Sequence, residues 1–310
     1  MTQQTRRDFL ARTSAATGAL ALGGRGLRAA EAAGADMAIA KWAGAAVASA
    51  DDIRKIAVQL TLKALEGVGG LKRFMSKGAV VWVKPNIGWD RAPETAANTN
   101  PDVVATIIKA CFEAGAKTVK VGDNTVNLAA KCYASSGIAD AAKAAGAQVL
   151  FLDKSRYKEM DIQGDKIKKI GVYPEVIESD LVINVPVVKH HRLSTATMCM
   201  KNYMGVIDDR KAFHQDIPNG LADLTRFMKP RLCVLDAVRI LTGNGPSGGD
   251  LKDVQTKLMV AAGVDIVALD AWGAEVMGKK PEEIGSVVSG AKAGLGKIDY
   301  KAIAKEVPVS

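Results

Sequence analysis

Short runs of Val, Ile and Leu recur along the chain, and each is followed by polar residues and then by an Ala-rich stretch that ends near a glycine. Continuous apolar runs of about four to eight residues are typical of buried strands, while longer stretches with helical spacing predict helices. Strands that alternate with helices indicate a mostly parallel sheet. The pattern therefore predicts an α/β fold, with helices on both faces of a mostly parallel sheet.

Two helices are predicted with defined ends. One begins after Asn100, which can cap it, has Pro101 and Asp102 in its first turn, and stops at Gly115. The other covers 138–145. A small hairpin is expected around 163–165, within a polar segment over 154–175. The predicted strands are 79–83, 118–121, 149–152, 181–188, 232–235 and 266–269.

The first 33 residues form a separate segment. Arg6 and Arg7 precede an uncharged stretch from Ser14 to Gly24, and small residues near Ala32 offer a cleavage site. A helix of this stretch, at ~1.5 Å per residue, is too short to cross a ~30 Å hydrocarbon core. The segment resembles a twin-arginine export signal, with a basic disordered N-terminus as the other interpretation. This resemblance implies that 1–33 is a signal peptide, recognised by the twin-arginine translocation machinery, and that the protein is periplasmic or otherwise exported. We also expect no stable membrane span in the mature chain.

Composition restricts the function classes. Of the 310 residues, 48% are hydrophobic and 24% are charged, which is typical of a soluble globular chain. The net charge is +9, and loss of 1–33 would remove five arginines and two acidic residues. Because no run of Lys and Arg is interleaved with aromatics, we expect no nucleic-acid partner and infer a small anionic molecule instead. The mature domain is predicted over 37–305, with 37–175 and 176–305 as two lobes around a cleft.

The four cysteines, at 111, 132, 199 and 233, are far apart and include no Cys-x-x-Cys pair. This spacing excludes an iron–sulfur cluster held by four neighbouring cysteines, and it predicts no particular disulfide.

Polar residues follow most of the predicted strands. Ligands of open parallel sheets bind beyond the carboxyl ends of the strands, so these residues predict a binding cleft. Asp and Asn in such places also cap helices or form turns, which is the alternative for each of them taken singly. The residues concerned are Lys84, Asn86, Asp123, Asn124, Asp153, Lys189, His190, His191, Asp236 and Asp270.

All three histidines of the chain lie between positions 190 and 214. His190 and His191 are neighbours, so in an extended chain they point to opposite sides and at most one faces the cleft. Imidazoles near the Lys201 amine can perform acid–base chemistry or hold a metal, and His191 and His214 are the candidate metal ligands. The methionines nearby also suggest a soft metal such as copper, although core packing explains them better.

Two further features concern the same region. Ser194 or Thr195 is expected to cap a short helix that carries Thr197 and Lys201 on one face. Residues 242–249 contain Gly-x-Gly-x-x-Gly, but no apolar helix follows, so a loop at the rim of the cleft is predicted. In that loop Asn244 and Gly245 are candidates for contacting a phosphate or carboxylate.

Several separate motifs together resemble one known family. With these motifs in this order, the chain is similar over about 40–300 to the domain-of-unknown-function 362 (DUF362) family, in an exported twin-arginine form. Some members carry an added ferredoxin-type module with cysteine quartets, which this chain lacks. The motifs are Lys84-Pro85-Asn86, Gly122-Asp123-Asn124, Ile183-Asn184-Val185-Pro186, Lys189-His190-His191, the segment from Met200 to Gly205 with Asn202, Asp236, and Asn244-Gly245-Pro246.

A fainter resemblance links the chain to the nickel-pincer lactate racemases. These place a cofactor-bearing lysine about ten residues after one histidine and before another. Here His191 precedes Lys201, and His214 follows it. The resemblance implies a site at these three residues, with a nickel-pincer cofactor as one option.

The leading hypothesis is an exported enzyme that uses a metal or bound cofactor on a small anionic metabolite. In it, Lys201, His191 and His214 are the catalytic or metal-binding residues, and Lys84 holds an anion together with Lys201. Asp123 and Asp236 would orient the cationic groups. The alternatives are a non-catalytic protein that binds or matures a metal or cofactor for an exported redox system, and an electron-transfer accessory.

Overall fold

The computed structural model describes residues 34–47 and 49–310, so the predicted export signal over 1–33 lies outside the described residues. Within the described part, ten strands form one sheet in the order β12-β1-β11-β10-β7-β2-β3-β4, with β8 and β9 attached beside β10. The strands are β1 (Met37–Trp42), β2 (Val80–Pro85), β3 (Thr118–Val121), β4 (Gln148–Val149), β7 (Leu181–Val185), β8 (Val187–His191), β9 (Thr195–Thr197), β10 (Leu232–Leu241), β11 (Val254–Gly263) and β12 (Ala304–Val309).

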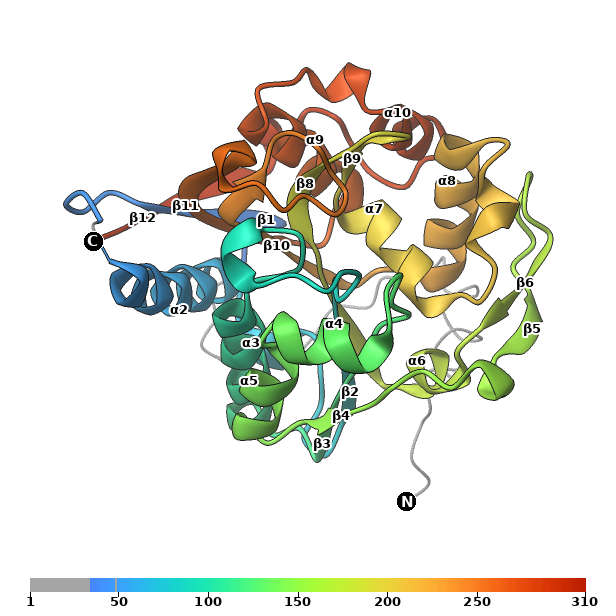
Figure 1. Cartoon of the computed structure of the whole chain (residues 1–310), viewed down its shortest axis with the longest axis horizontal. Helices are drawn as coiled ribbons and strands as arrows, with labels where there is room; N and C mark the ends of the chain where they lie inside the picture. The colour runs from blue at the N-terminus through green and yellow to red at the C-terminus, as the bar shows by residue number, and fades with distance from the viewer. Residues whose placement is uncertain (1–33, 48) are drawn as a thin grey trace, which may run out of the picture.

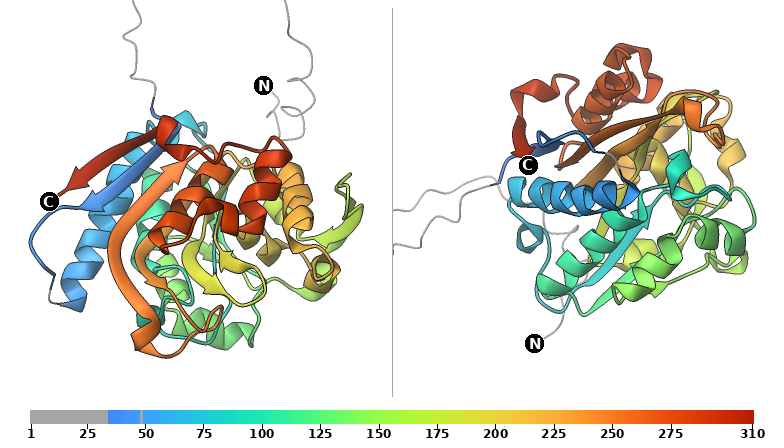
Figure 2. Two further views of the ribbon diagram at one scale, coloured as in Figure 1. Left: turned by 90° about the horizontal axis from the view of Figure 1, so that it is seen from above. Right: turned by 60° about the vertical axis from the view of Figure 1, so that its left-hand side comes forward.

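The sheet is mostly parallel. Strands β10, β7, β2, β3 and β4 run parallel to their neighbours in that order, whereas β11 is antiparallel to both β10 and β1. Strand β12 returns to pair in parallel with β1, so the last strand lies beside the first (Figure 2). Because β7 lies between β2 and β10, one sheet includes strands from both sides of the division expected near residue 175.

Helices cover both faces of this sheet (Figure 1). On one face lie α2 (Ala50–Gly67), α3 (Pro101–Glu113), α4 (Ala129–Ser135) and α5 (Ile138–Ala144). On the other face lie α6 (Pro174–Glu178), α7 (Cys199–Asn202), α8 (Ile217–Met228), α9 (Ile266–Val276) and α10 (Gly285–Lys292). The α/β fold predicted from the sequence is therefore confirmed.

Strand β2 shows how the sequence divides the core into two layers. Val81 and Val83 pack with α2 and α3, while Trp82 between them packs with the opposite core. This alternation follows from the two-residue period of a strand. Lys84 lies on the same face of the sheet as Trp82, and it pairs with Asn184 of the neighbouring strand β7. At the carboxyl end of this face, a lysine and an asparagine therefore follow the apolar residues.

Several local predictions are confirmed. Helix α3 begins after Asn100, whose side chain accepts a hydrogen bond from the backbone N–H of Asp102. Helix α5 and strand β3 also lie where the sequence placed them. The expected hairpin is formed by β5 (Lys158–Asp161) and β6 (Lys169–Val172), which pair antiparallel in a separate sheet.

Two local predictions are wrong. The apolar run 266–269 belongs to helix α9, because Asp265 caps it and the apolar residues continue as far as Val276. A helix buried on all sides cannot be distinguished from a strand by a short apolar run. Ser194 and Thr195 cap no helix either, since Thr195–Thr197 forms β9 and the following helix begins only at Cys199.

Strand order determines where a site can form. The carboxyl ends of β2, β3 and β7 lie at the same edge because these strands are parallel neighbours. After Pro186 the chain enters β8, which pairs with β10 and carries Lys189 to this edge. Among the described residues, no helix combines the length and apolar character that a membrane crossing requires.

Helix α7 is held in place by a buried carboxylate of α9. Asp270 accepts hydrogen bonds from the backbone N–H groups of Cys199 (2.6 Å) and Met200 (3.1 Å), the first residues of α7. A carboxylate at this end of a helix meets N–H groups that have no partner within the helix.

We expect Asp270→Ala to lower the free energy of unfolding by about 2–4 kcal/mol, because two buried N–H groups lose their acceptor. Asp270→Asn retains one acceptor oxygen and should lose less. Urea denaturation of both variants measures the difference. Equal stability of Asp270→Ala and the unchanged protein would contradict this role for the carboxylate.

Candidate functional site

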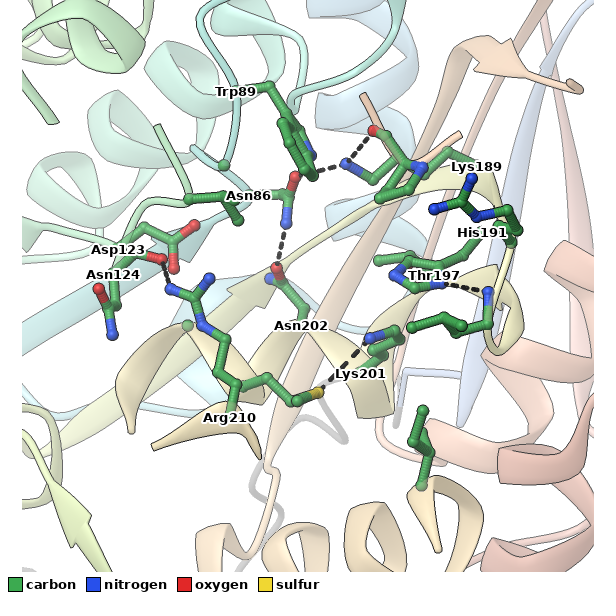
Figure 3. A pocket seen from close by; sticks show the side chains of 18 of the residues that line it. Asn86, Trp89, Asp123, Asn124, Lys189, His191, Thr197, Lys201, Asn202 and Arg210 are labelled. Carbon is green, nitrogen blue, oxygen red and sulfur yellow. Dashed lines mark hydrogen bonds between the residues drawn. The ribbon is translucent and has the colours of Figure 1, made fainter. Parts of the chain in front are cut away.

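A pocket of about 390 Å³ lies at the carboxyl edge of β2 and β3 (Figure 3). Its walls come from the loops after these strands, from β8 and β9, from α7, and from the segment that follows α7. Residues from both sides of position 175 therefore line it. They are Asn86, Gly88, Trp89, Asp123, Asn124, Val126, Lys189, His191, Arg192, Leu193, Thr197, Lys201, Asn202, Met204, Gly205, Arg210, His214, Ile217 and Pro246.

A buried ion pair forms the floor of the site. Lys84 is completely buried, and its Nζ lies 2.7 Å from Oδ1 of Asp123, which is almost as deeply buried. The same amine donates to the carbonyl oxygen of Pro85 and to Oδ1 of Asn202. Burial lowers the pKa of Lys84, and the Asp123 carboxylate opposes that shift. The negative charge of Asp123 is thus neutralised by Lys84, and its Oδ2 also accepts a hydrogen bond from the backbone N–H of Ile87.

A chain of side-chain amides extends from this pair. Asn86 donates through Nδ2 to Oδ1 of Asn202, and Asn202 donates through Nδ2 to Oδ1 of Asn184. Asn184 donates in turn to the carbonyl oxygen of Cys199 in α7. This network connects β2 and β7 to helix α7. Because each amide has a hydrogen-bond partner, the network favours one arrangement of these three elements.

Lys189 is a second buried amine, and it is bound to three oxygens. Its Nζ donates to Oδ1 of Asn86 (2.9 Å) and to the carbonyl oxygens of Ala97 and Pro246. Burial, together with repulsion from Lys201 and Lys84, lowers the pKa of Lys189 to about 7. Since its three N–H donors are all used, Lys189 orients the Asn86 amide.

Lys201 is placed differently. It lies in the last turn of α7, and its Nζ contacts only the Sδ of Met204, at 3.5 Å, among the described residues. A thioether is a weak acceptor, so the amine keeps its capacity to bind or react. Burial lowers the pKa of Lys201 to about 8, with a further contribution from the positive charge of Arg210.

Arg210 begins the short 3₁₀ segment η5 (Arg210–Phe213) and extends into the pocket near Asp123 (Figure 3). Its Nη2 donates to the backbone carbonyl oxygens of Asn124 and Thr125. In the described part of the chain, no carboxylate lies within ion-pair distance of Arg210 or of Lys201. Both cations are therefore without a protein counterion.

The ring of His191 is fixed by the turn between β8 and β9. Its Nδ1 accepts hydrogen bonds from the backbone N–H groups of Leu193 (3.1 Å) and Ser194 (3.3 Å). Burial and the nearby Lys201 and Lys189 charges lower the pKa of His191 to about 3, so the ring is neutral at ordinary pH. A neutral ring whose Nδ1 accepts carries its hydrogen on Nε2.

This tautomer bears on the expected metal site. His191 presents an N–H donor to the pocket, whereas a metal requires a nitrogen lone pair. Across residues 34–47 and 49–310, no three His, Cys, Asp or Glu side chains are grouped so that they could hold a metal ion together. The observed arrangement of His191 does not fit a metal ligand, and we assign no step to a metal.

One hydroxyl in the pocket wall has no hydrogen-bond partner. Thr197 is 5% exposed, lines the pocket, and its Oγ1 is buried without a partner in the described structure. An unpaired buried hydroxyl is costly, so a bound molecule that pairs with it would recover that free energy.

The structure brings together eight of the residues that the sequence singled out, since they all line this pocket. They are Asn86, Asp123, Asn124, Lys189, His191, Lys201, Asn202 and His214. His214 is exposed and lies at the rim, where it follows η5. Lys84 lies beneath the lining and reaches the pocket only through Asp123 and Asn202.

Other candidates lie away from the lining. His190 points away from His191, as expected for neighbours on a strand, and its Nδ1 accepts from the N–H of Gly245. Asn244 is exposed and bonds to Asp253. Asp236 was expected to orient a cation, but its carboxylate accepts from the N–H groups of Asn100 and Val238.

Sequence reasoning missed Arg210 as a site residue. It follows Asp208 and Asp209, and such a charged stretch is typical of a solvated loop. The sequence feature that could have indicated Arg210 is its position between Lys201 and His214, two candidate site residues.

Gly205 lies directly above the buried ion pair, and a Cβ there would collide with Asp123 Oδ1 and Lys84 Nζ. We expect Gly205→Ala to separate the pair and to cost about 3–5 kcal/mol of unfolding free energy. Gly88→Ala is the matched control, because the nearest atom to its Cβ is Asn86 Oδ1 at 3.7 Å, an ordinary contact. Thermal and urea unfolding of both variants test this, and equal losses would refute it.

Comparison with known proteins gives a family and distant structural neighbours. A thylakoid-associated protein of Synechocystis sp. is 27% identical over 241 residues, covering 74% of this chain and 73% of that protein. The lactate racemase apoprotein from Thermoanaerobacterium thermosaccharolyticum superimposes with a TM-score of 0.45 at 12% identity, covering 73% of this chain and 53% of the racemase. A protein from Thermotoga maritima gives a TM-score of 0.38 at 10% identity, with 79% and 59% covered. The chain thus spans a little over half the length of each of these two structures.

The model of the domain of unknown function DUF362 matches residues 81–275, which is more than half of the chain and includes the pocket residues from Asn86 to Pro246. The protein therefore belongs to the DUF362 family.

Proposed function

We propose that this protein is an enzyme that acts on a small anionic metabolite bound in the pocket, with Lys201 as the reactive group. The observation that carries the proposal is the presence of two cations, Lys201 and Arg210, that face the pocket and form no ion pair with any carboxylate of the described residues. The only carboxylate of the lining, Asp123, is already paired with Lys84.

The other groups that face the pocket also favour an anion. His191 offers an N–H donor and Thr197 an unpaired hydroxyl, so the wall is rich in donors. Donors and cations that are fixed before a ligand arrives bind carboxylate or phosphate oxygens without reorganisation. A volume of about 390 Å³ is in the range of pockets that bind small molecules.

Catalysis is favoured over simple binding by the state of Lys201. A protein that only binds an anion needs a permanent cation, for which arginine serves best. An amine whose pKa is about 8 is partly neutral near physiological pH and can accept a proton or attack a carbon. Helix α7, held by Asp270, keeps this amine in position.

We expect Lys201→Gln and Arg210→Gln each to weaken binding of propionate and of inorganic phosphate about tenfold or more, because a charged hydrogen bond is lost. In the unchanged protein, affinity should fall as the pH rises through about 8, since the cationic form of Lys201 is present below that value. Isothermal titration calorimetry between pH 6 and pH 9 measures both effects.

Lys252→Gln is the matched control, because this lysine pairs with Asp250 on the exposed surface away from the pocket. Its affinity for both anions should equal that of the unchanged protein. If neither anion bound, or if the Lys201 and Arg210 variants bound as well as the control, the assignment of this pocket would be abandoned.

The export hypothesis belongs to the same proposal. It is supported by Arg6 and Arg7, which precede the uncharged stretch from Ser14 to Gly24. We expect the double change Arg6→Lys and Arg7→Lys to leave the protein inside the cell, as judged by fractionation of a bacterial host with a twin-arginine system. Conversion of Arg25 and Arg28 to lysine is the charge-matched control, and equal export of both forms would rule out this route.

A further inference from the structure

We infer that Lys201 forms an imine with a small carbonyl compound that also carries a carboxylate, namely an oxo acid such as pyruvate. This inference rests on the proposed function and names the substrate class and the covalent step. It is drawn from the positions of the Lys201 amine, the Arg210 guanidinium and the unpaired donors around them.

The three lysine amines of the site differ in their contacts. Lys84 is paired with a carboxylate, and Lys189 donates to three oxygens, so neither amine is available for reaction. Within the described part of the chain, the only hydrogen-bond partner of the Lys201 amine is the thioether of Met204. Of these three, it alone can lose a proton and attack without breaking a charged contact.

Arg210 offers a place for an anionic group in the same pocket as the Lys201 amine. Arg210 and Lys201 both line the pocket, and they are close enough for the arginine charge to affect the lysine amine. A carboxylate bound by Arg210 and a carbonyl attacked by Lys201 can therefore belong to one small molecule in this pocket. An oxo acid, which carries both groups in one molecule, meets this requirement.

The carbonyl oxygen of such a compound would also meet donors of the pocket wall. The Nε2–H of His191 and the hydroxyl of Thr197 lie at the same wall as Lys201, and neither has a hydrogen-bond partner among the described residues (Figure 3). Donors placed at an oxygen that gains negative charge stabilise the addition step. Exposed Leu193 and Val126, which also line the pocket, leave room at the mouth for an apolar substituent of the acid.

The step balances without an external oxidant or reductant. The lone pair of neutral Lys201 attacks the carbonyl carbon, so that a C–N bond forms and the C=O bond becomes a single bond. One proton moves from nitrogen to oxygen to give the carbinolamine. The C–O bond then breaks, the oxygen leaves as water with a second proton, and the imine remains on Lys201.

The experiment is reductive trapping with pyruvate and sodium cyanoborohydride on the full-length protein, followed by digestion and mass spectrometry. We expect one reduced pyruvyl group on the peptide that contains Lys201 and none on the same peptide of Lys201→Arg. The trapping rate should rise as the pH rises through about 8, because attack needs the neutral amine. Arg210→Gln should lower the rate about tenfold or more, since the carboxylate loses its partner.

Two further probes separate the possible outcomes. Acetone has the carbonyl without the carboxylate and should label Lys201 poorly, whereas propionate has the carboxylate without the carbonyl and should compete with pyruvate. Labelling spread over exposed lysines and equal in Lys201→Arg and Lys252→Arg would overturn the inference. If propionate bound in a manner that needs Arg210 while Lys201 stayed unlabelled, the imine would be refuted and the proposed function would stand. If no anion bound, both would fail.

Discussion

The buried pair of Lys84 and Asp123 is the interaction on which the site depends. Two charges removed from water are tolerable only when they lie close together and their remaining hydrogen-bonding capacity is used. Here the pair lies at the carboxyl ends of β2 and β3, and Asn202 connects it to α7. The sheet and the helix that carries Lys201 are thus joined through a charged contact rather than through apolar packing alone.

The same contact explains how the pocket acquires its character. Because Asp123 forms an ion pair with the buried Lys84, its negative charge does not neutralise the positive charges of Lys201 and Arg210 at the pocket surface. Lys189 in turn holds Asn86 and leaves Lys201 as the amine with the weakest contacts. The lysines of the site therefore have different roles. Lys84 and Lys189 stabilise the structure of the pocket, whereas Lys201 faces the ligand.

Much of the fold could be predicted from the sequence, because strand and helix periods are local. The capped start of α3 and the strand β3 are examples. The run at 266–269 was misassigned because the burial that makes α9 apolar on every side depends on tertiary packing. Pocket residues such as Asn86, Asp123 and Lys189 could be proposed because parallel strands share one edge. The separate tasks of the three lysines could not be predicted, since Lys84 and Lys189 are held by partners 118 and 103 residues away in the sequence, whereas Lys201 contacts only nearby Met204 among the described residues.

The turn between β8 and β9 has a consequence for relatives of this chain. The backbone amides of Leu193 and Ser194 determine which nitrogen of His191 bears the hydrogen. A homologue with a longer or shorter connection at this point could keep every residue of the pocket wall and yet offer a lone pair where this protein offers a donor. Such a protein would bind electron-poor ligands at this position. Two relatives with the same pocket side chains can therefore differ in the ligands they bind.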